Sequence, residues 1–214
     1  MIYGEKFLTE SNEPKIIKYK EILDEATKLL EIEYKWLVLD ADCYEKIYPL
    51  YMSINEKNAE NNYKEIEKIF NQNISKMKKI YDFEEYEETR NKLKKKISSS
   101  LHLYFTELPL LKNSDINNYK LKFKNTLNKI YNDTDKYYDK YKEYIEKVDY
   151  SKIYKTISKK HGEIYKNFPE LFDKYDNPDG SYVEVQLDGI REDIGDIHSD
   201  IKFYTKNLLL NRVN

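Results

Sequence analysis

Two short acidic motifs are the residues of this chain whose types and spacing could support catalysis. Asp40 and Asp42 form an Asp-x-Asp pair directly after the apolar residues 36–39, and Asp196 and Asp200 lie in a Gly-Asp-x-x-x-Asp pattern. A carboxylate of the first motif could attack a phosphoryl group, and carboxylates of the second could hold the cation that offsets phosphate charge. The spacing therefore indicates a magnesium-dependent phosphoryl-transfer site, provided that both motifs follow strands.

Residues 36–42 resemble the first motif of the haloacid-dehalogenase-like phosphatases, and residues 195–200 resemble the magnesium motif of that family. The resemblance implies that Asp40 is a nucleophile, that Asp42 is a general acid and base, and that the acids of the second motif bind magnesium. Residues 190–194, however, continue a helical heptad pattern, and the intervening chain shows no alternation of strands and helices. We therefore predict that the chain is not an enzyme, and we keep the phosphatase as an alternative.

Histidine and cysteine give no pattern typical of a metal or nucleophilic site. His102, His161 and His198 are far apart, none follows a glutamate by three residues, and Cys43 is the only cysteine. The spacing therefore lacks the Glu-x-x-His motif of di-iron bundles and every cysteine-ligated zinc pattern. There is also no Gly-rich phosphate loop, so the sequence predicts no metal and no cofactor.

Lysine and tyrosine alternate over residues 136–166, where the rings could stack on unpaired bases while lysines neutralise phosphates. The stretch contains no arginine, and acidic residues interrupt it. Many of its tyrosines also recur at helical spacing, as core residues do. The stretch therefore has two interpretations. It is an ordinary helix with a core face and a solvated face, or, as the alternative, it binds single-stranded nucleic acid.

The composition predicts an all-α fold. The chain has 214 residues but only 5 glycines and 5 prolines, which disfavours folds built on tight turns. Apolar residues recur at three- and four-residue spacing in successive stretches between residues 13 and 175. We expect an irregular, elongated helical bundle over residues 1–175, with an interruption at Pro49 and a helix of roughly 30 residues after Ser114.

The last segment, residues 176–214, predicts a coiled-coil-like helix. Ser181 and Glu184 have the spacing of a capping box. A strand over residues 182–187 is the alternative for its first turns. The apolar positions that follow have the 3.5-residue period of a heptad seam and are the predicted interaction residues. They are Val183, Leu187, Ile190, Ile194, Ile197, Ile201, Tyr204 and Leu208.

Charge and composition then suggest the class of protein. Residues 1–60 carry a net charge of -5, residues 61–175 carry +7 and residues 176–214 carry -4. The abundance of lysine, asparagine, isoleucine and tyrosine fits an AT-rich microbial or phage genome. No signal peptide or membrane span is evident, so we expect a cytoplasmic protein.

We predict that the chain is a non-enzymatic protein-interaction module. A narrower version of this prediction is an inhibitor, immunity or anti-defence protein of a microbe or phage. Its seam would bind another protein, pair with a second copy, or dock on the bundle. Of the last two, we slightly favour self-association.

Overall fold

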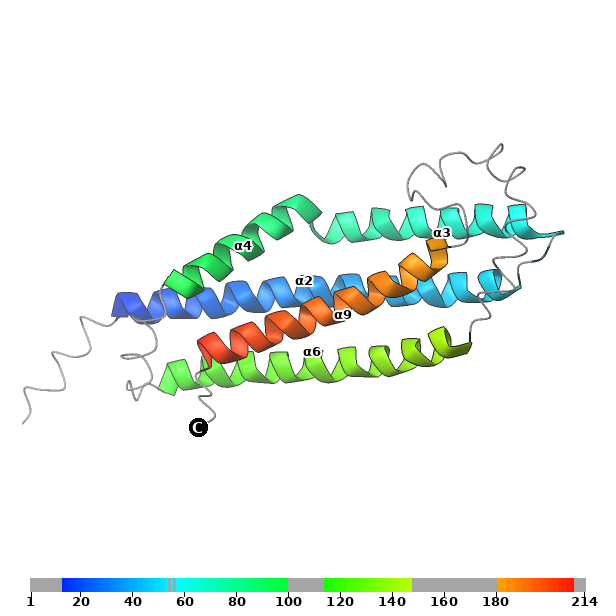
Figure 1. Ribbon diagram of the computed structural model, residues 1–214. Coiled ribbons are helices and arrows are strands. Elements are labelled where there is room, and N and C mark those ends of the chain that lie inside the picture. The colour runs from blue at the N-terminus through cyan, green and yellow to red at the C-terminus, as the bar shows by residue number, and fades with distance from the viewer. Residues whose placement is uncertain (1–12, 54, 56, 100–113, 148–180, 210–214) are drawn as a thin grey trace, which may run out of the picture. The chain divides into compact units, whose positions relative to one another are not determined.

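The computed structural model describes residues 13–53, 55, 57–99, 114–147 and 181–209, and over these residues it contains five α-helices and no strand (Figure 1). The prediction of an all-α helical fold is thereby confirmed. The helices are α2 (Glu13–Met52), α3 (Ala59–Ile80), α4 (Phe83–Ser99), α6 (Ser114–Lys147) and α9 (Ser181–Leu208).

Helix α2 is one continuous element of 40 residues. Pro14 lies in its first turn, where the missing N–H of proline costs no hydrogen bond. Pro49 does not end the helix, which continues to Met52, and the carbonyl of Pro49 accepts a hydrogen bond from the Ser53 amide at 3.2 Å. The apolar residues 36–39 therefore lie inside a helix and not in a strand.

Local hydrogen bonds mark where α3 and α4 begin, from a side chain at α4 and from the backbone at α3. The Asp82 carboxylate accepts hydrogen bonds from the amides of Glu84 and Glu85 at 3.0 and 3.1 Å, which satisfies two free donors in the first turn of α4. The Asn58 carbonyl accepts the Asn62 amide at the start of α3. The caps predicted at Ser114 and Ser181 involve side chains outside the described residues.

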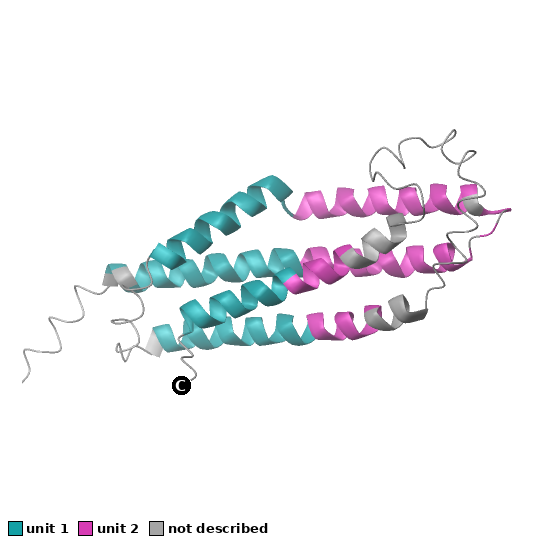
Figure 2. Ribbon diagram, viewed as in Figure 1, with its two compact units in different colours: residues 1–34, 81–133, 196–214 teal, residues 35–80, 134–195 magenta. Residues whose placement is uncertain are grey.

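The chain divides into two compact units (Figure 2). Unit 1 comprises residues 1–34, 81–133 and 196–214, and unit 2 comprises residues 35–80 and 134–195. Helices α2, α6 and α9 thus contribute residues to both units. The predicted domain boundary between residues 175 and 176 falls outside the described residues.

In unit 1, α2, α4, α6 and α9 pack around one core. The Phe123 ring of α6 meets the Tyr204 ring of α9 edge to face, with centroids 6.5 Å apart. The Tyr19 hydroxyl of α2 donates a hydrogen bond to the Leu208 carbonyl at the end of α9. Leu93 and Ile97 are the apolar side chains with which α4 enters this core.

In unit 2, α3, α6 and α9 contribute residues that contact the second half of α2. The Trp36 indole donates a hydrogen bond to the Met77 carbonyl of α3 at 3.0 Å. The Tyr44 ring packs edge to face on Tyr141 of α6, with centroids 5.2 Å apart. An exposed ion pair between Glu45 and Lys140 adds a second contact of α2 with α6.

None of the described helices has the length and the continuous apolar character that a membrane span requires.

Substituting Gly195 of α9 tests whether helix propensity limits the stability of this element. A Cβ atom at this exposed position would meet no atom within 4 Å. We therefore expect Gly195→Ala to raise the free energy of unfolding by about 1 kcal/mol, because glycine is the weakest helix former after proline. Gly195→Ser should give a smaller gain. Urea denaturation followed by circular dichroism measures both, and an alanine variant no more stable than wild type would contradict the expectation.

Candidate functional site

The seam residues of α9 are buried within the single chain. Ile190 and Ile194 lie in the core of unit 2, and the seam positions from 197 to 208 lie in the core of unit 1. Val183 and Leu187 have side chains outside the described residues. Helix α9 begins at Ser181, so the stretch 182–187 is helical and not a strand. The sequence left open whether the seam pairs with another chain or docks on the bundle. In the structure the described seam side chains pack within the chain.

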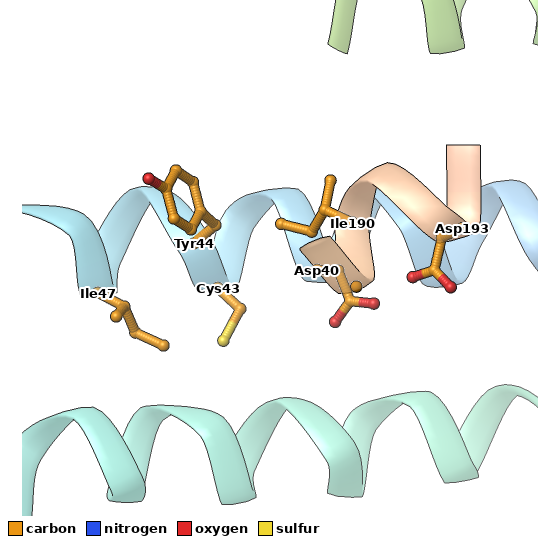
Figure 3. Close-up of a pocket in the computed structure, with 7 residues that line it drawn as sticks. Asp40, Cys43, Tyr44, Ile47, Ile190 and Asp193 are labelled. Atoms are coloured by element: carbon orange, nitrogen blue, oxygen red, sulfur yellow. The ribbon is translucent and has the colours of Figure 1, made fainter. Parts of the chain in front are cut away.

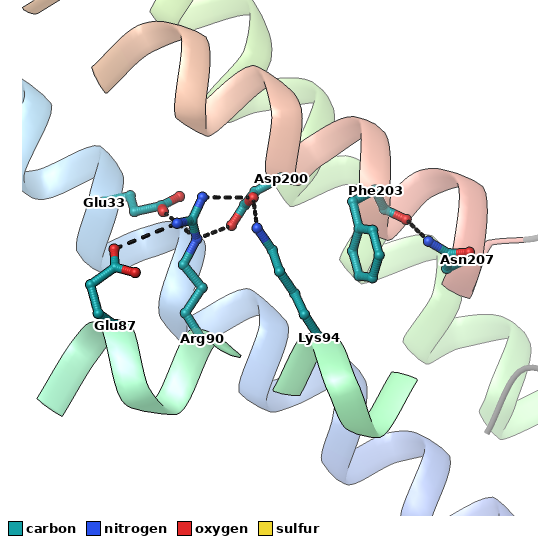
Figure 4. A network of polar contacts seen from close by, with 7 residues as sticks. All are labelled: Glu33, Glu87, Arg90, Lys94, Asp200, Phe203 and Asn207. Carbon is teal, nitrogen blue, oxygen red and sulfur yellow. Dashed lines mark hydrogen bonds and ion pairs between the residues drawn. The ribbon is translucent and has the colours of Figure 1, made fainter. Parts of the chain in front are cut away.

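A cluster of charged side chains is buried in unit 1 around Asp200, whose side chain is 2% exposed (Figure 4). The Arg90 guanidinium of α4 donates two hydrogen bonds to the Asp200 carboxylate, from Nε at 2.7 Å and from Nη2 at 2.9 Å. The Lys94 ammonium, one turn further along α4, pairs with the same carboxylate. Arg90 Nε also lies 3.5 Å from Glu33 Oε1 of α2. The cluster therefore joins three helices of unit 1 through one arginine.

Glu33 is the member of this cluster whose pKa is shifted toward neutral pH. Burial is the main cause that raises its pKa, and the negative charge of Asp200 raises it as well, whereas the Tyr86 hydroxyl and the charges of Arg90 and Lys94 oppose the shift. The pKa that results from all of these causes is about 7. The hydrogen bond with Asp200 raises the pKa of the Arg90 guanidinium, which stays charged. The cluster is thus a set of mutually paired charges, and Glu33 is the group in it that titrates near neutral pH.

Asp40, the nucleophile implied by the phosphatase resemblance, lines a small cavity in unit 2 (Figure 3). Asp40 Oδ1 accepts a hydrogen bond from the Asn73 amide of α3 at 2.7 Å. Burial raises the pKa of Asp40, and hydrogen bonds with Asp193 and Asn73 oppose that shift.

The cavity itself has a volume of about 60 Å³. Small-molecule sites usually measure roughly 300–1,000 Å³, so this cavity has room for a few water molecules and not for a metabolite. Cys43 also lines it, and burial raises the pKa of that thiol to about 12, which keeps it protonated and unreactive.

The remaining acids of the two motifs do not line this cavity. Asp42 is exposed on α2, and Asp196 is exposed on α9. Asp200 is engaged with two cations in unit 1, as described above. Helical backbone surrounds all of these residues, whereas the phosphatase motifs would need strands before them.

Histidine serves packing where it is described. The His198 ring stacks on Tyr131 with centroids 4.4 Å apart and an interplanar angle of 22°. His102 and His161 lie outside the described residues. Over the part of the chain that the structure describes, no group of three or more histidine, cysteine, aspartate or glutamate side chains could hold a metal ion.

The exposed side of α6 in unit 1 forms a polar surface, which we call the outer face of α6. Residues 116–132 contain no aspartate or glutamate. Leu121, with 57% of its surface exposed, lies in this segment, which also carries three exposed lysines. The face consists of Leu121, Tyr131, Lys122, Lys124, Lys129, Asn117, Asn118, Asn125, Asn128 and Asn132.

Lys120 does not belong to the outer face, because it turns toward α2. Its ammonium lies 5.6 Å from the centre of the Tyr19 ring, and Lys20 in turn lies 4.8 Å from the centre of the Tyr119 ring. Burial lowers the pKa of Lys120. These reciprocal contacts hold the inner side of α6 on α2 and leave its opposite side exposed.

The Lys- and Tyr-rich stretch predicted from sequence over residues 136–166 is described only to residue 147, and its side chains only to residue 141. Within that part, Tyr141 is buried and Tyr138 is exposed.

Sequence reasoning missed the two features that the structure brings forward. Arg90 is one of three arginines in a lysine-rich chain, and that rarity could have marked it as a residue selected for a bidentate contact. Apolar periodicity does not reveal the outer face of α6, because this face repeats asparagine and lysine.

Comparison of the chain with protein families, with curated proteins and with solved structures gives no match.

Removing the charge of Asp200 tests the buried cluster. Asp200→Asn would leave Arg90 and Lys94 without their shared carboxylate, and we expect a loss of about 3 kcal/mol in the free energy of unfolding. The matched control is Asp196→Asn, one turn away and exposed, which should change stability by less than about 0.5 kcal/mol. Chemical denaturation of both variants measures the difference, and equal effects would show that the cluster is not structural.

The raised pKa of Glu33 predicts a pH dependence of stability. The folded-state pKa of about 7 lies above the ordinary value of 4.5, so the folded state binds an extra proton between these two pH values. Stability from this group is therefore complete below about pH 4.5 and is lost as the pH rises toward 7, by roughly 3 kcal/mol at most.

Glu33→Gln removes this titration while keeping the shape of the side chain. We expect the variant to be more stable than wild type above pH 7 and to show a flatter profile between about pH 5 and 7. Thermal melts across this range supply the measurement. A wild-type stability that rises through the same window, in step with the variant, would show that Glu33 ionises normally.

Proposed function

We propose that the chain is a non-enzymatic protein-interaction module and that its contact surface is the outer face of α6. The observation that carries the proposal is the exposure of Leu121 on a helix face that has lysines beside it and no acidic residue over residues 116–132. An exposed leucine supplies apolar contact area, while the surrounding charge steers a partner and selects it. We place this interaction in the cytoplasm.

The buried seam of α9 supports this choice of surface over the seam. Ile197 and Ile201 already pack within unit 1, so pairing with a second copy through them would require α9 to leave its present contacts. Self-association through the seam would therefore cost the burial of several large side chains, each worth roughly 1.5–3 kcal/mol. The outer face of α6 needs no such rearrangement.

Single-stranded nucleic-acid binding is the second candidate function, and the exposed lysines of α6 are the observation that favours it. Lys122, Lys124 and Lys129 could contact phosphates. The face, however, presents Tyr131 as its one aromatic ring, and that ring already stacks on His198. Because binding to single strands relies on free stacking rings, we rank this function below protein interaction.

Leu121→Ser tests the proposed function, because it removes the apolar contact without disturbing buried residues. Its matched control is Ile17→Ser, since Ile17 of α2 is also about half exposed. The wild-type chain and both variants are immobilised and incubated with a lysate of cells that make the protein. We expect at least one protein to be retained by wild type and Ile17→Ser and to fall several-fold on Leu121→Ser.

Two results would contradict the proposal. If the proteins retained are the same for all three chains, the outer face of α6 is not the contact surface. If the purified chain releases phosphate from an aryl phosphate in the presence of magnesium, and Asp40→Asn abolishes the release, the chain is an enzyme.

A further inference from the structure

We propose that the outer face of α6 binds an acidic α-helix of a partner protein in heptad register. This inference rests on the proposed function and names the chemistry of the partner. It is carried by a second heptad pattern in the chain, which is polar, faces outward and is distinct from the buried apolar seam of α9.

Asparagine recurs every seven residues along α6. Asn118, Asn125 and Asn132 are all exposed, and Leu121 and Asn128 lie between them. The five positions are separated by intervals of 3, 4, 3 and 4 residues, which is the spacing of a coiled-coil seam. They therefore form one stripe along the helix, with the asparagines at one set of core positions and Leu121 at the other.

Lysines flank this stripe on both sides. Lys122 and Lys129 are also seven residues apart and directly follow Leu121 and Asn128, while Lys124 directly precedes Asn125. In heptad terms these are the two positions beside the seam, where charges select the partner helix. Residues 116–132 carry no carboxylate, and Asp133, one turn beyond Lys129, already accepts a hydrogen bond from the Tyr34 hydroxyl. The net charge of the face is therefore positive, and a partner with basic flanks would be repelled. Charge complementarity thus requires glutamate or aspartate beside the partner's seam.

The asparagines specify the rest of the partner. An asparagine at a core position fixes the register of a coiled coil by pairing with another amide, and it lowers the stability of the contact. A partner helix would therefore carry amide side chains opposite Asn118, Asn125 and Asn132 and an apolar residue opposite Leu121. Such a polar seam predicts a specific, reversible contact between folded proteins and not a permanent assembly.

Two other occupants fit the face less well. Three exposed lysines could neutralise about three phosphates of a single strand, which gives weak binding that falls quickly with salt. A second copy of this chain could present the exposed acids of α2 or α9, such as Glu21 and Glu192, but the described side chains of those two helices include no exposed asparagine or glutamine to pair with the asparagines of α6.

The experiment uses the full chain and three fluorescent probes. The first is a peptide of about three heptads with asparagine and leucine at its core positions and glutamate at both flanking positions. The second peptide has lysine at the flanking positions instead, and the third probe is an oligothymidine. Fluorescence anisotropy is measured near physiological salt, about 0.15 M. We expect the acidic peptide to bind at least about tenfold more tightly than either of the others.

Charge reversal on the face identifies the surface that binds. Lys122→Glu combined with Lys129→Glu should weaken binding of the acidic peptide by about tenfold or more. The matched control is Lys28→Glu combined with Lys35→Glu on α2, two exposed lysines that are also seven residues apart. The control should change affinity by less than about twofold, and circular dichroism should show both variants folded.

Each contrary result has its own meaning. Equal binding of the two peptides, or equal effects of the two double variants, would overturn the proposal. Tighter binding of oligothymidine that the α6 reversal abolishes would assign the face to nucleic acid. A wild-type dimer by light scattering that the same reversal dissociates would assign it to a second copy. If the acidic peptide does not bind but Leu121→Ser still loses its cellular partner, only the identity of the partner is wrong.

Discussion

The burial of one carboxylate governs how the helices of unit 1 can meet. Asp200 is buried in unit 1 with its side chain 2% exposed, and an unpaired charge there would cost several kcal/mol. Arg90 and Lys94 meet that cost only when α4 lies with both cations on the same side of Asp200. Arg90 also reaches Glu33, so the position of α4 is fixed against α2 as well as α9. An arrangement of these helices that separated Asp200 from both cations would leave a buried charge unpaired, so the cluster disfavours such arrangements.

Helical periodicity could predict much of this structure. The stripe that includes Ile194 and Ile197 predicted the helix α9, and the pattern after Ser114 predicted the long helix α6. Periodicity is local, whereas Arg90 and Asp200 are separated by 110 residues. The sequence around either residue therefore does not predict that the two form a pair. The same limit applies to Asp40, because its motif shows neither the helical backbone around it nor the hydrogen bond that it accepts from Asn73.

The chain carries two heptad patterns, of which one is buried and the other is exposed. The apolar pattern of α9 is enclosed by neighbouring helices, so its mean period of 3.5 residues did not by itself identify an intermolecular contact. The polar pattern of α6 remains on the surface because asparagine and lysine lose little by staying in water. A heptad repeat in such a protein thus indicates that a helix has a preferred side, and the residue types indicate whether that side faces the core or the solvent.

The fluorescence of Trp36 reports on the structure around one contact of unit 2. Trp36 is the only tryptophan of the chain, and its indole nitrogen is bonded to the end of α3 in unit 2. Emission from that ring follows the loss of the α2–α3 contact, while the far-ultraviolet signal averages over every helix. Coincident transitions by the two signals would show that the units lose structure as one cooperative system. Separate transitions would instead reveal a partly folded species in which one unit survives the other.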